Sequence, residues 1–246
     1  QKKRKGCEYK FYTEFQSHEA EFDYLKSLDI NERINSVAWA GRTSDSLCLL
    51  STNGTCFLYQ YSNIHKHKDK TIKLWKVKER RAETIVENNR HNNRRLTLPK
   101  TIKQHEPTAA ATPKHQFPHT HAYHIHSLSA CSDNATFLSA DDLRINLWPI
   151  DLFDGNYKQV YNLVDLKPST IEELTEVITA ATFHPTHCNL FGYSTSKGAV
   201  RLGDMRLSAL CDRASTTFGS SSGVPQTGPN GTFFTEIVQS VSDLKF

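Results

Sequence analysis

The sequence predicts an all-β fold in which antiparallel sheets form the blades of a β-propeller. Three segments repeat one pattern: an apolar strand, a short turn, a second apolar strand that ends in serine, and then an alternating strand. The three serines and the residues that close the last strands are Ser51, Ser139 and Ser194, and Trp75, Trp148 and Asp204. Such self-similarity is typical of propeller blades. It favours a protein that works through binding surfaces rather than through catalysis.

Composition excludes several other classes. The 246 residues are enough to bury a substantial core, and the net charge of +4 is too mild to indicate nucleic-acid binding. The six cysteines are scattered without a C-x-x-C pair, which indicates a reducing compartment and no disulfide framework. No run approaches the roughly 18 apolar residues of a membrane span, and the basic N-terminus does not resemble a signal peptide. We therefore expect the protein to reside in the cytoplasm or the nucleus.

The elements follow in order along the chain. Residues 9–15 are rich in aromatic side chains and alternate in part, so they predict a strand, and residues 22–28 predict an amphipathic turn or a short edge segment. The repeats then open with strands that carry apolar residues at alternate positions. These openings are residues 34–39, 125–130 and 178–183, with a fourth at 241–246.

The first repeat is longer than the others. Nine positions separate Ser139 from Trp148, whereas 24 separate Ser51 from Trp75. Deleting residues 54–68 would restore a sequence closely parallel to the second repeat. Two explanations stay open: a genuine long turn, which propellers tolerate at little cost, or untranslated sequence included by error.

Two further segments are too long or too flexible for ordinary blade connections. Residues 78–118 are polar, basic and rich in histidine, and they contain four prolines. They form either a disordered loop or an extended hairpin arm between blades. Residues 215–231 are rich in Gly, Ser and Thr, which predicts a flexible loop.

Candidate chemistry is sparse. A histidine run suggests zinc, but no cysteine lies close in sequence and no carboxylate falls within the run, so we expect no metal and no cofactor. The run comprises His115, His119, His121, His124 and His126. No phosphate-binding loop, G-x-S-x-G or H-E-x-x-H motif is present, and Glu172, Glu173 and Glu176 are typical of an acidic helix start. We expect a protein that is not an enzyme.

Several long strings resemble the 55-kDa (B-type) regulatory subunits of protein phosphatase 2A, a WD-repeat family. They are far more specific than a WD dipeptide, and they cover most of residues 9–246 except 54–68, much of 78–118, and 218–230. The strings are residues 15–28, 138–148, 172–180, 183–185, 204–213 and 233–237.

The resemblance implies a seven-bladed propeller, of which residues 1–246 make up about the first half. It also implies a regulatory role beside a HEAT-repeat scaffold subunit and a catalytic Ser/Thr phosphatase subunit. In that family the propeller recruits phosphoprotein substrates, and a hairpin arm from the second blade, here residues 78–118, contacts the scaffold. No nucleic acid or membrane partner is implied.

The family binds substrates in an acidic groove on the top face. The positions that match the groove are Phe22, Glu32, Arg33, His124, Asp142 and Leu174. Acidic groups there would attract Lys/Arg-rich segments that flank a phosphosite. An Asp in such a turn commonly accepts backbone hydrogen bonds, so of the adjacent carboxylates Asp141 is expected to hold the turn and Asp142 to meet substrate. Asn31, where the family favours a carboxylate, weakens the groove charge.

The largest departure from the family is coverage. The family has a strand unit before residue 1 and about three more blades after residue 246, so we expect a fragment or an incomplete gene product. An open propeller leaves strand edges and apolar faces exposed. The alternative hypothesis is a generic WD-repeat interaction scaffold that never meets the phosphatase.

Overall fold

Three four-stranded antiparallel sheets form the body of the computed structural model. The structure describes residues 9, 11–18, 20–23, 27–30, 33–43, 46–53, 70–80, 83–85, 102–104, 108–117, 120–150, 160–168, 170–211, 216–219 and 240–246. Within them the secondary structure is almost entirely β, with one short 3-10 helix, η1 (Ile171–Glu173). The predicted all-β class is confirmed.

Each sheet contains one of the predicted repeats, with its strands ordered as in the sequence. The first sheet consists of β3 (Ile34–Thr43), β4 (Ser46–Asn53), β5 (Ile72–Arg80) and β8 (Thr108–Phe117). The second consists of β9 (Ser127–Ala130), β10 (Thr136–Ala140), β11 (Arg144–Pro149) and β12 (Tyr161–Asp165). The third consists of β13 (Ile178–Phe183), β14 (Leu190–Thr195), β15 (Val200–Asp204) and β16 (Thr216–Phe218).

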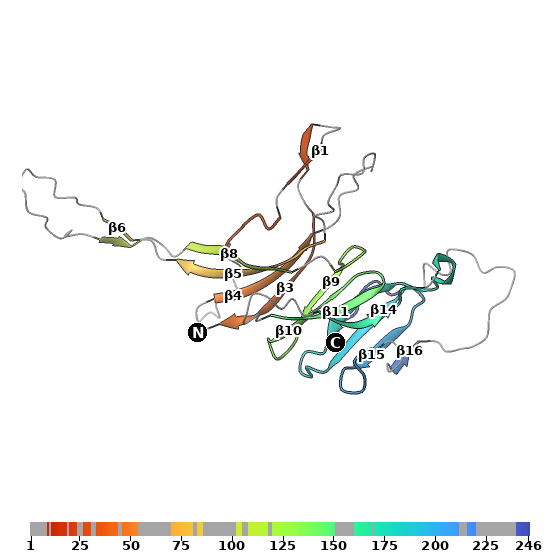
Figure 1. Ribbon diagram of the computed structural model, residues 1–246. Helices are drawn as coiled ribbons and strands as arrows, with labels where there is room; N and C mark the ends of the chain where they lie inside the picture. The colour runs from red at the N-terminus through yellow and green to blue at the C-terminus, as the bar shows by residue number, and fades with distance from the viewer. Residues whose placement is uncertain are drawn as a thin grey trace, which may run out of the picture.

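The sheets pack face to face through two apolar layers. Strand β9 contacts both β3 and β13, so the first strands of consecutive sheets adjoin, as propeller blades do (Figure 1). Between the first and second sheets, the Phe117 ring lies 4.8 Å from Phe137 and 5.4 Å from Trp148. Between the second and third, Phe191 and Tyr193 are fully buried. These layers fix the strand ends that carry the site.

The predicted strand at residues 9–15 is wrong. The described residues there form no strand, and Tyr9 and Phe11 are exposed. Phe15 packs on Trp75 of β5 with ring centroids 4.8 Å apart, and the Thr13 hydroxyl donates to the Ala109 carbonyl at 2.9 Å. The aromatic content of this segment therefore reflects packing against the first sheet, not strand pairing.

Residues 22–28, predicted as a turn or edge segment, contribute to a two-stranded hairpin. Strand β1 (Glu21–Asp23) pairs with β2 (Leu28–Ile30), and Ser27 in the turn has a φ of 49°. Figure 1 shows β1 projecting from the body of the molecule.

The predicted strand at residues 241–246 is also wrong. The segment lies against the third sheet, where the Phe246 ring is 4.9 Å from that of His184. A strand needs the backbone N–H and C=O groups of a neighbour, and no described strand pairs with this segment.

The structure describes none of the predicted insertion after β4, but it describes part of the segment after β5. The predicted insertion at 54–68 lies outside the described residues, but its flanks meet, since the Thr71 N–H donates to Asn53 Oδ1 at 2.9 Å. Within residues 78–118, β5 and β8 pair as far as Arg80 and Thr108. Beyond them β6 (Glu83–Ile85) pairs with β7 (Ile102–Gln104), and this ribbon extends away from the sheets (Figure 1).

After β15, residues 205–211 form a strap that joins the third sheet back to the second. Leu163 is the extra residue of a bulge in β12, because Ile145 pairs with Val164 and Asn146 with Asn162. The Leu163 carbonyl accepts the Cys211 N–H at 2.7 Å, and the Cys211 side chain is fully buried. The strap thus satisfies a backbone group that the β-ladder omits.

Two further predictions concern cysteines and membranes. The described cysteines Cys48, Cys131, Cys188 and Cys211 are free thiols. Among the described residues, no helix is long and apolar enough to span a bilayer.

Candidate functional site

The loops that carry the predicted site lie at one end of the sheets. Because β3, β9 and β13 begin there, and β4, β10 and β14 end there, antiparallel pairing brings their connecting turns together. We call this end the upper edge. Its described segments are residues 33, 120–126, 141–143, 166–168, 170–177 and 196–199.

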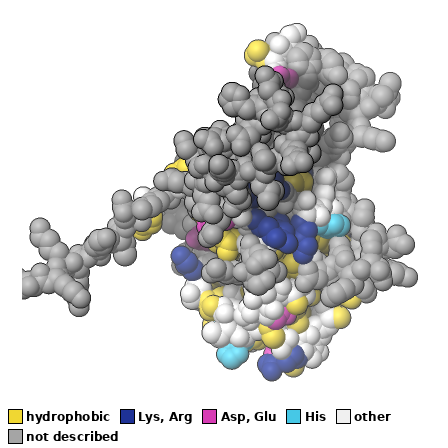
Figure 2. Space-filling model, turned by 90° about the vertical axis from the view of Figure 1, so that its left-hand side faces the viewer, with side chains coloured by type: hydrophobic (Ala, Val, Ile, Leu, Met, Phe, Trp, Pro, Cys, Tyr) yellow, Lys and Arg dark blue, Asp and Glu magenta, His cyan; other side chains and the backbone are white. Residues whose placement is uncertain are grey.

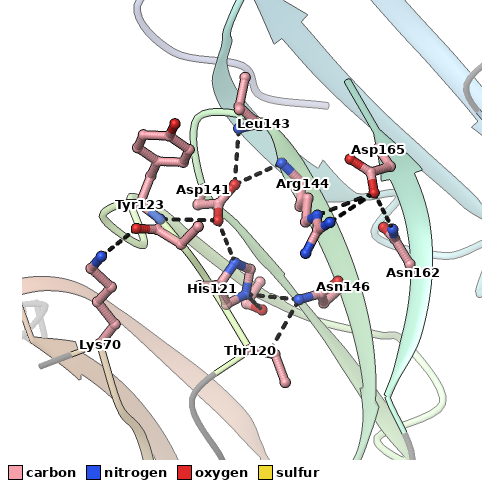
Figure 3. A network of polar contacts seen from close by, with 12 residues as sticks. Lys70, Thr120, His121, Tyr123, Asp141, Leu143, Arg144, Asn146, Asn162 and Asp165 are labelled. Atoms are coloured by element: carbon pink, nitrogen blue, oxygen red, sulfur yellow. Dashed lines mark hydrogen bonds and ion pairs between the residues drawn. The ribbon is translucent and has the colours of Figure 1, made fainter. Parts of the chain in front are cut away.

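A buried polar network anchors the upper edge of the second sheet, and Figure 3 shows its part around His121 and Asp141. The Trp148 indole N–H donates to Ser139 Oγ at 2.7 Å, and Ser139 Oγ lies 2.6 Å from His121 Nε2. His121 Nδ1 lies 3.0 Å from Asp141 Oδ2. All four side chains are buried, so each polar atom depends on its neighbour for hydrogen bonding.

Asp141 holds the turn between β10 and β11. Its Oδ1 accepts the N–H groups of Leu143 at 2.9 Å and Arg144 at 2.6 Å, and its Oδ2 accepts that of Tyr123 at 3.4 Å. Burial opposes ionisation, but the hydrogen bond and charge of His121, together with the Leu143 and Arg144 N–H donors, lower the pKa of Asp141. The expected turn-holding role of Asp141 is confirmed.

The other sheets contain partial versions of this network. In the first sheet, the Trp75 N–H donates to Ser51 Oγ at 3.0 Å, and Asn53 stands where the second sheet has Asp141. His18 Nε2 lies 3.0 Å from Thr71 Oγ1. In the third sheet, Gly203 pairs with Phe191 as Trp148 pairs with Phe137 in the second. Only the second sheet, among those described, combines Asp, His, Ser and Trp.

Asp142 meets different surroundings from its neighbour. Its side chain is half-buried, and its backbone carbonyl accepts the Ile178 N–H at 2.8 Å, which places it at the junction of the second and third sheets. Burial is the largest cause that raises the pKa of Asp142. The nearby His126 and His124 oppose this rise, whereas the Asp141 charge adds to it. An incompletely compensated carboxylate is suited to attract a cationic ligand.

The structure places the other predicted site residues unevenly. His124 and Leu174 lie in upper-edge loops, where Leu174 is 40% exposed, and His124 interacts electrostatically with Asp142. Arg33 is exposed and directly precedes β3. Phe22 belongs to β1 of the separate hairpin, and Glu32 lies outside the described residues. The second and third sheets therefore supply the best-defined part of the site.

Ion pairs occupy other charged groups near this end. Glu176 pairs with Arg201 at 2.7 Å, and Arg144 pairs with Asp165 at 3.1 Å. Glu172 and Glu173 lie in the first turn of η1, as predicted. On the face that Figure 2 shows, the described Lys and Arg side chains form separate groups instead of one continuous stripe.

The histidine run in the sequence does not reveal the role of His121 in the buried network. The histidine run suggests a zinc ligand at this position, but the His121 ring bonds Ser139 and Asp141. Its signal is a histidine some twenty residues before an Asp that follows a strand-ending serine. In the described part of the chain, no group of three or more His, Cys, Asp or Glu side chains is placed to hold a metal ion.

The sheets define a segment of a WD-repeat β-propeller, and the turns that carry the candidate site lie at its upper edge. No family model matches the chain. It is 49% identical to a B-type protein phosphatase PP2A regulatory subunit of Candida tropicalis, over 100% of its own length and 46% of that protein. It is 46% identical to the Schizosaccharomyces pombe protein of the same name, over 99% of the chain and 50% of that protein.

A third relative is the protein phosphatase PP2A 55 kDa regulatory subunit of Drosophila melanogaster, 47% identical over 98% of the chain and 45% of that protein. Over nearly its whole length the chain is thus similar to B-type regulatory subunits of protein phosphatase PP2A. It spans about half the length of the curated relatives it matches. All three names describe regulatory subunits, as expected for a chain that is not an enzyme.

Proposed function

We propose that this protein acts as a regulatory subunit of protein phosphatase 2A that recruits phosphoprotein substrates through its upper edge. Its partners in this role are a HEAT-repeat scaffold subunit and the catalytic subunit. Identity of 46 to 49% to named regulatory subunits, over nearly the whole chain, is the observation that carries the proposal.

The upper edge supplies the chemistry for recruitment. Asp142 provides a carboxylate that no hydrogen bond among the described residues ties to the turn, and Leu174 provides exposed apolar surface. A substrate segment with Lys or Arg beside the phosphosite would meet the carboxylate through screened attraction, and an apolar residue would dock on Leu174. The ribbon of β6 and β7 is the element that we assign to the scaffold contact, since it projects from the sheets.

Substrate capture is tested by one charge variant and one apolar variant of the upper edge, with a matched charge control. We expect Asp142→Asn and Leu174→Ala each to weaken binding of a Lys/Arg-rich phosphopeptide by about threefold to tenfold. Asp133→Asn is the control, because it removes the same charge from the opposite end of the sheets while keeping a side-chain acceptor for the Ala135 N–H. Equal effects of Asp142→Asn and Asp133→Asn would show that net charge, not the upper edge, governs binding.

Association with the phosphatase is tested separately by co-purification of the tagged chain with scaffold and catalytic subunits. We expect both subunits to be retained by the wild type and by Asp142→Asn. Substrate binding without either subunit would favour the generic interaction scaffold. The described cysteines are free thiols, which supports a reducing compartment. We therefore also propose that the protein resides in the cytoplasm or the nucleus, and fluorescence microscopy of the tagged chain tests this.

A further inference from the structure

His126 lies beside Asp142 at the junction of the second and third sheets, and none of the roles described above involves it. Its backbone N–H donates to the Ala140 carbonyl at 3.0 Å, directly before the turn that holds Asp141 and Asp142. The main chain of Asp141 and Ile178 lies close enough to the ring to favour its charged form. The ring is thus placed between the turn and the first strand of the third sheet.

Hydrogen bonding fixes one side of the ring. His126 Nδ1 lies 2.8 Å from Ser127 Oγ, and that oxygen accepts the Ala181 N–H of β13 at 3.2 Å. The serine hydroxyl has a proton and a second lone pair, so it can donate to Nδ1 of the neutral ring or accept from a protonated Nδ1.

The other side of the ring lacks such a partner. His126 Nε2 is buried, and it makes no hydrogen bond to any described residue. Burial is the main cause that lowers the pKa of His126, whereas the charges of Asp142 and Asp141 act in the opposite direction. Asp141 is already bonded to His121 and to backbone N–H groups, so Asp142 is the carboxylate left to respond to a charge on His126.

We propose that His126 is a positioning residue that sets how strongly Asp142 attracts basic segments, so that protonation of His126 weakens substrate capture. This inference rests on the proposed recruiting function of the upper edge. At neutral pH the ring is uncharged and the Asp142 carboxylate acts alone. When the pH falls, Nδ1 also carries a proton and donates to Ser127 Oγ, and the cationic ring offsets the Asp142 charge. Asp141 and His124 are the other titratable groups that act on Asp142 among the described residues.

The coupling is measured first by NMR titration of the His126 ring in the full chain. Removing the Asp142 charge should lower the midpoint, because that charge favours the protonated ring. We therefore expect Asp142→Asn to lower the His126 midpoint and Asp133→Asn, which removes a charge at the opposite end, to leave it unchanged. An unchanged midpoint in Asp142→Asn overturns the inference.

The consequence for binding is measured with a fluorescent Lys/Arg-rich peptide that carries one phosphoserine. When the pH is lowered from about 7.5 to the acidic end of the ring titration that NMR measures, wild-type affinity should fall by roughly two- to fivefold more than that of His126→Asn, the scale of a screened ion pair. Asparagine keeps a polar group near the position of Nδ1, and His124→Gln controls for the other histidine. A pH dependence that persists in His126→Asn but disappears in His124→Gln also overturns the inference.

The two measurements separate this inference from the proposed function. If the wild type binds no peptide at either pH, the recruiting function fails, and the inference fails with it even where the ring titration shows coupling. If the peptide binds but His126→Asn retains the full pH dependence, recruitment stands and the inference fails.

Discussion

At the turn between β10 and β11, Asp141 and Asp142 are adjacent in sequence but differ in their contacts. Asp141 is fully buried and accepts hydrogen bonds from His121 and three backbone N–H groups. Asp142 is half-buried, and burial disfavours its charged form. The first therefore stabilises the turn, whereas the second is available for binding.

Alanine substitutions should separate these roles in stability. Asp141→Ala leaves His121 and the turn N–H groups without their acceptor, so we expect a loss of about 3 kcal/mol in the free energy of unfolding. Asp142→Ala should change it by only about 0.5 kcal/mol, as at sites away from such networks. Urea denaturation measures both values. Similar losses in the two variants would contradict the assignment.

Among the strands, β14 and β15 of the third sheet show how one blade differs from its neighbours. Gly203 occupies the position of Trp148, and the Phe191 ring fills the space that a side chain would need. A Cβ added at Gly203 would lie 2.6 Å from Phe191 Cζ, and Phe191 is fully buried. The pair Phe191 and Gly203 thus helps to fill the layer between the second and third sheets, as Phe137 and Trp148 fill the layer between the first and second sheets.

Gly203→Ala should therefore destabilise the protein by about 1–3 kcal/mol, because the buried ring has little room to move. The control is Gly219→Ala, whose added Cβ would come no closer than 3.4 Å to its nearest neighbour, the Ala199 Cα. Thermal unfolding compares the two. Combining Gly203→Ala with Phe191→Leu should recover part of the loss if the clash is the cause. No recovery would indicate a different origin.

At the scale of the whole molecule, the buried His18 makes stability depend on pH. Burial is the main cause that lowers the pKa of His18 from 6.5 to about 4, with the Lys73 charge adding to it and the Thr71 backbone opposing it. The unfolded chain therefore binds a proton at a higher pH than the folded chain does. The stability that neutral His18 contributes is complete above pH 6.5 and is lost as the pH falls towards about 4.

Replacing His18 should accordingly flatten the stability curve in this window. We expect His18→Gln, which keeps a donor near the position of Nε2, to show a smaller loss of unfolding free energy between pH 6.5 and about 4. His187→Gln changes an exposed histidine and serves as the control. Denaturant midpoints at several pH values give the comparison, and parallel curves for wild type and His18→Gln would refute the role of His18.

Much of the fold was predictable because blade sequences repeat. The alternation around Ser51, Ser139 and Ser194 located the central strands of all three sheets. Residues 9–15 were not predictable as coil, since aromatic side chains that pack on Trp75 resemble those of a strand. The partnership of His121 and Asp141 spans a loop, and no local spacing shows it. The placement of Asp142 came from family resemblance rather than from physical patterning.

The strap between Cys211 and the bulge at Leu163 has a consequence for how the blades open. The Cys211 amide proton is held by a strand of the preceding sheet, so it can exchange with solvent only when the two sheets part locally. Separation would also uncover the bulged edge of β12, a template for pairing with other chains. Hydrogen exchange at the Cys211 amide should thus report the free energy of this local separation of the second and third sheets.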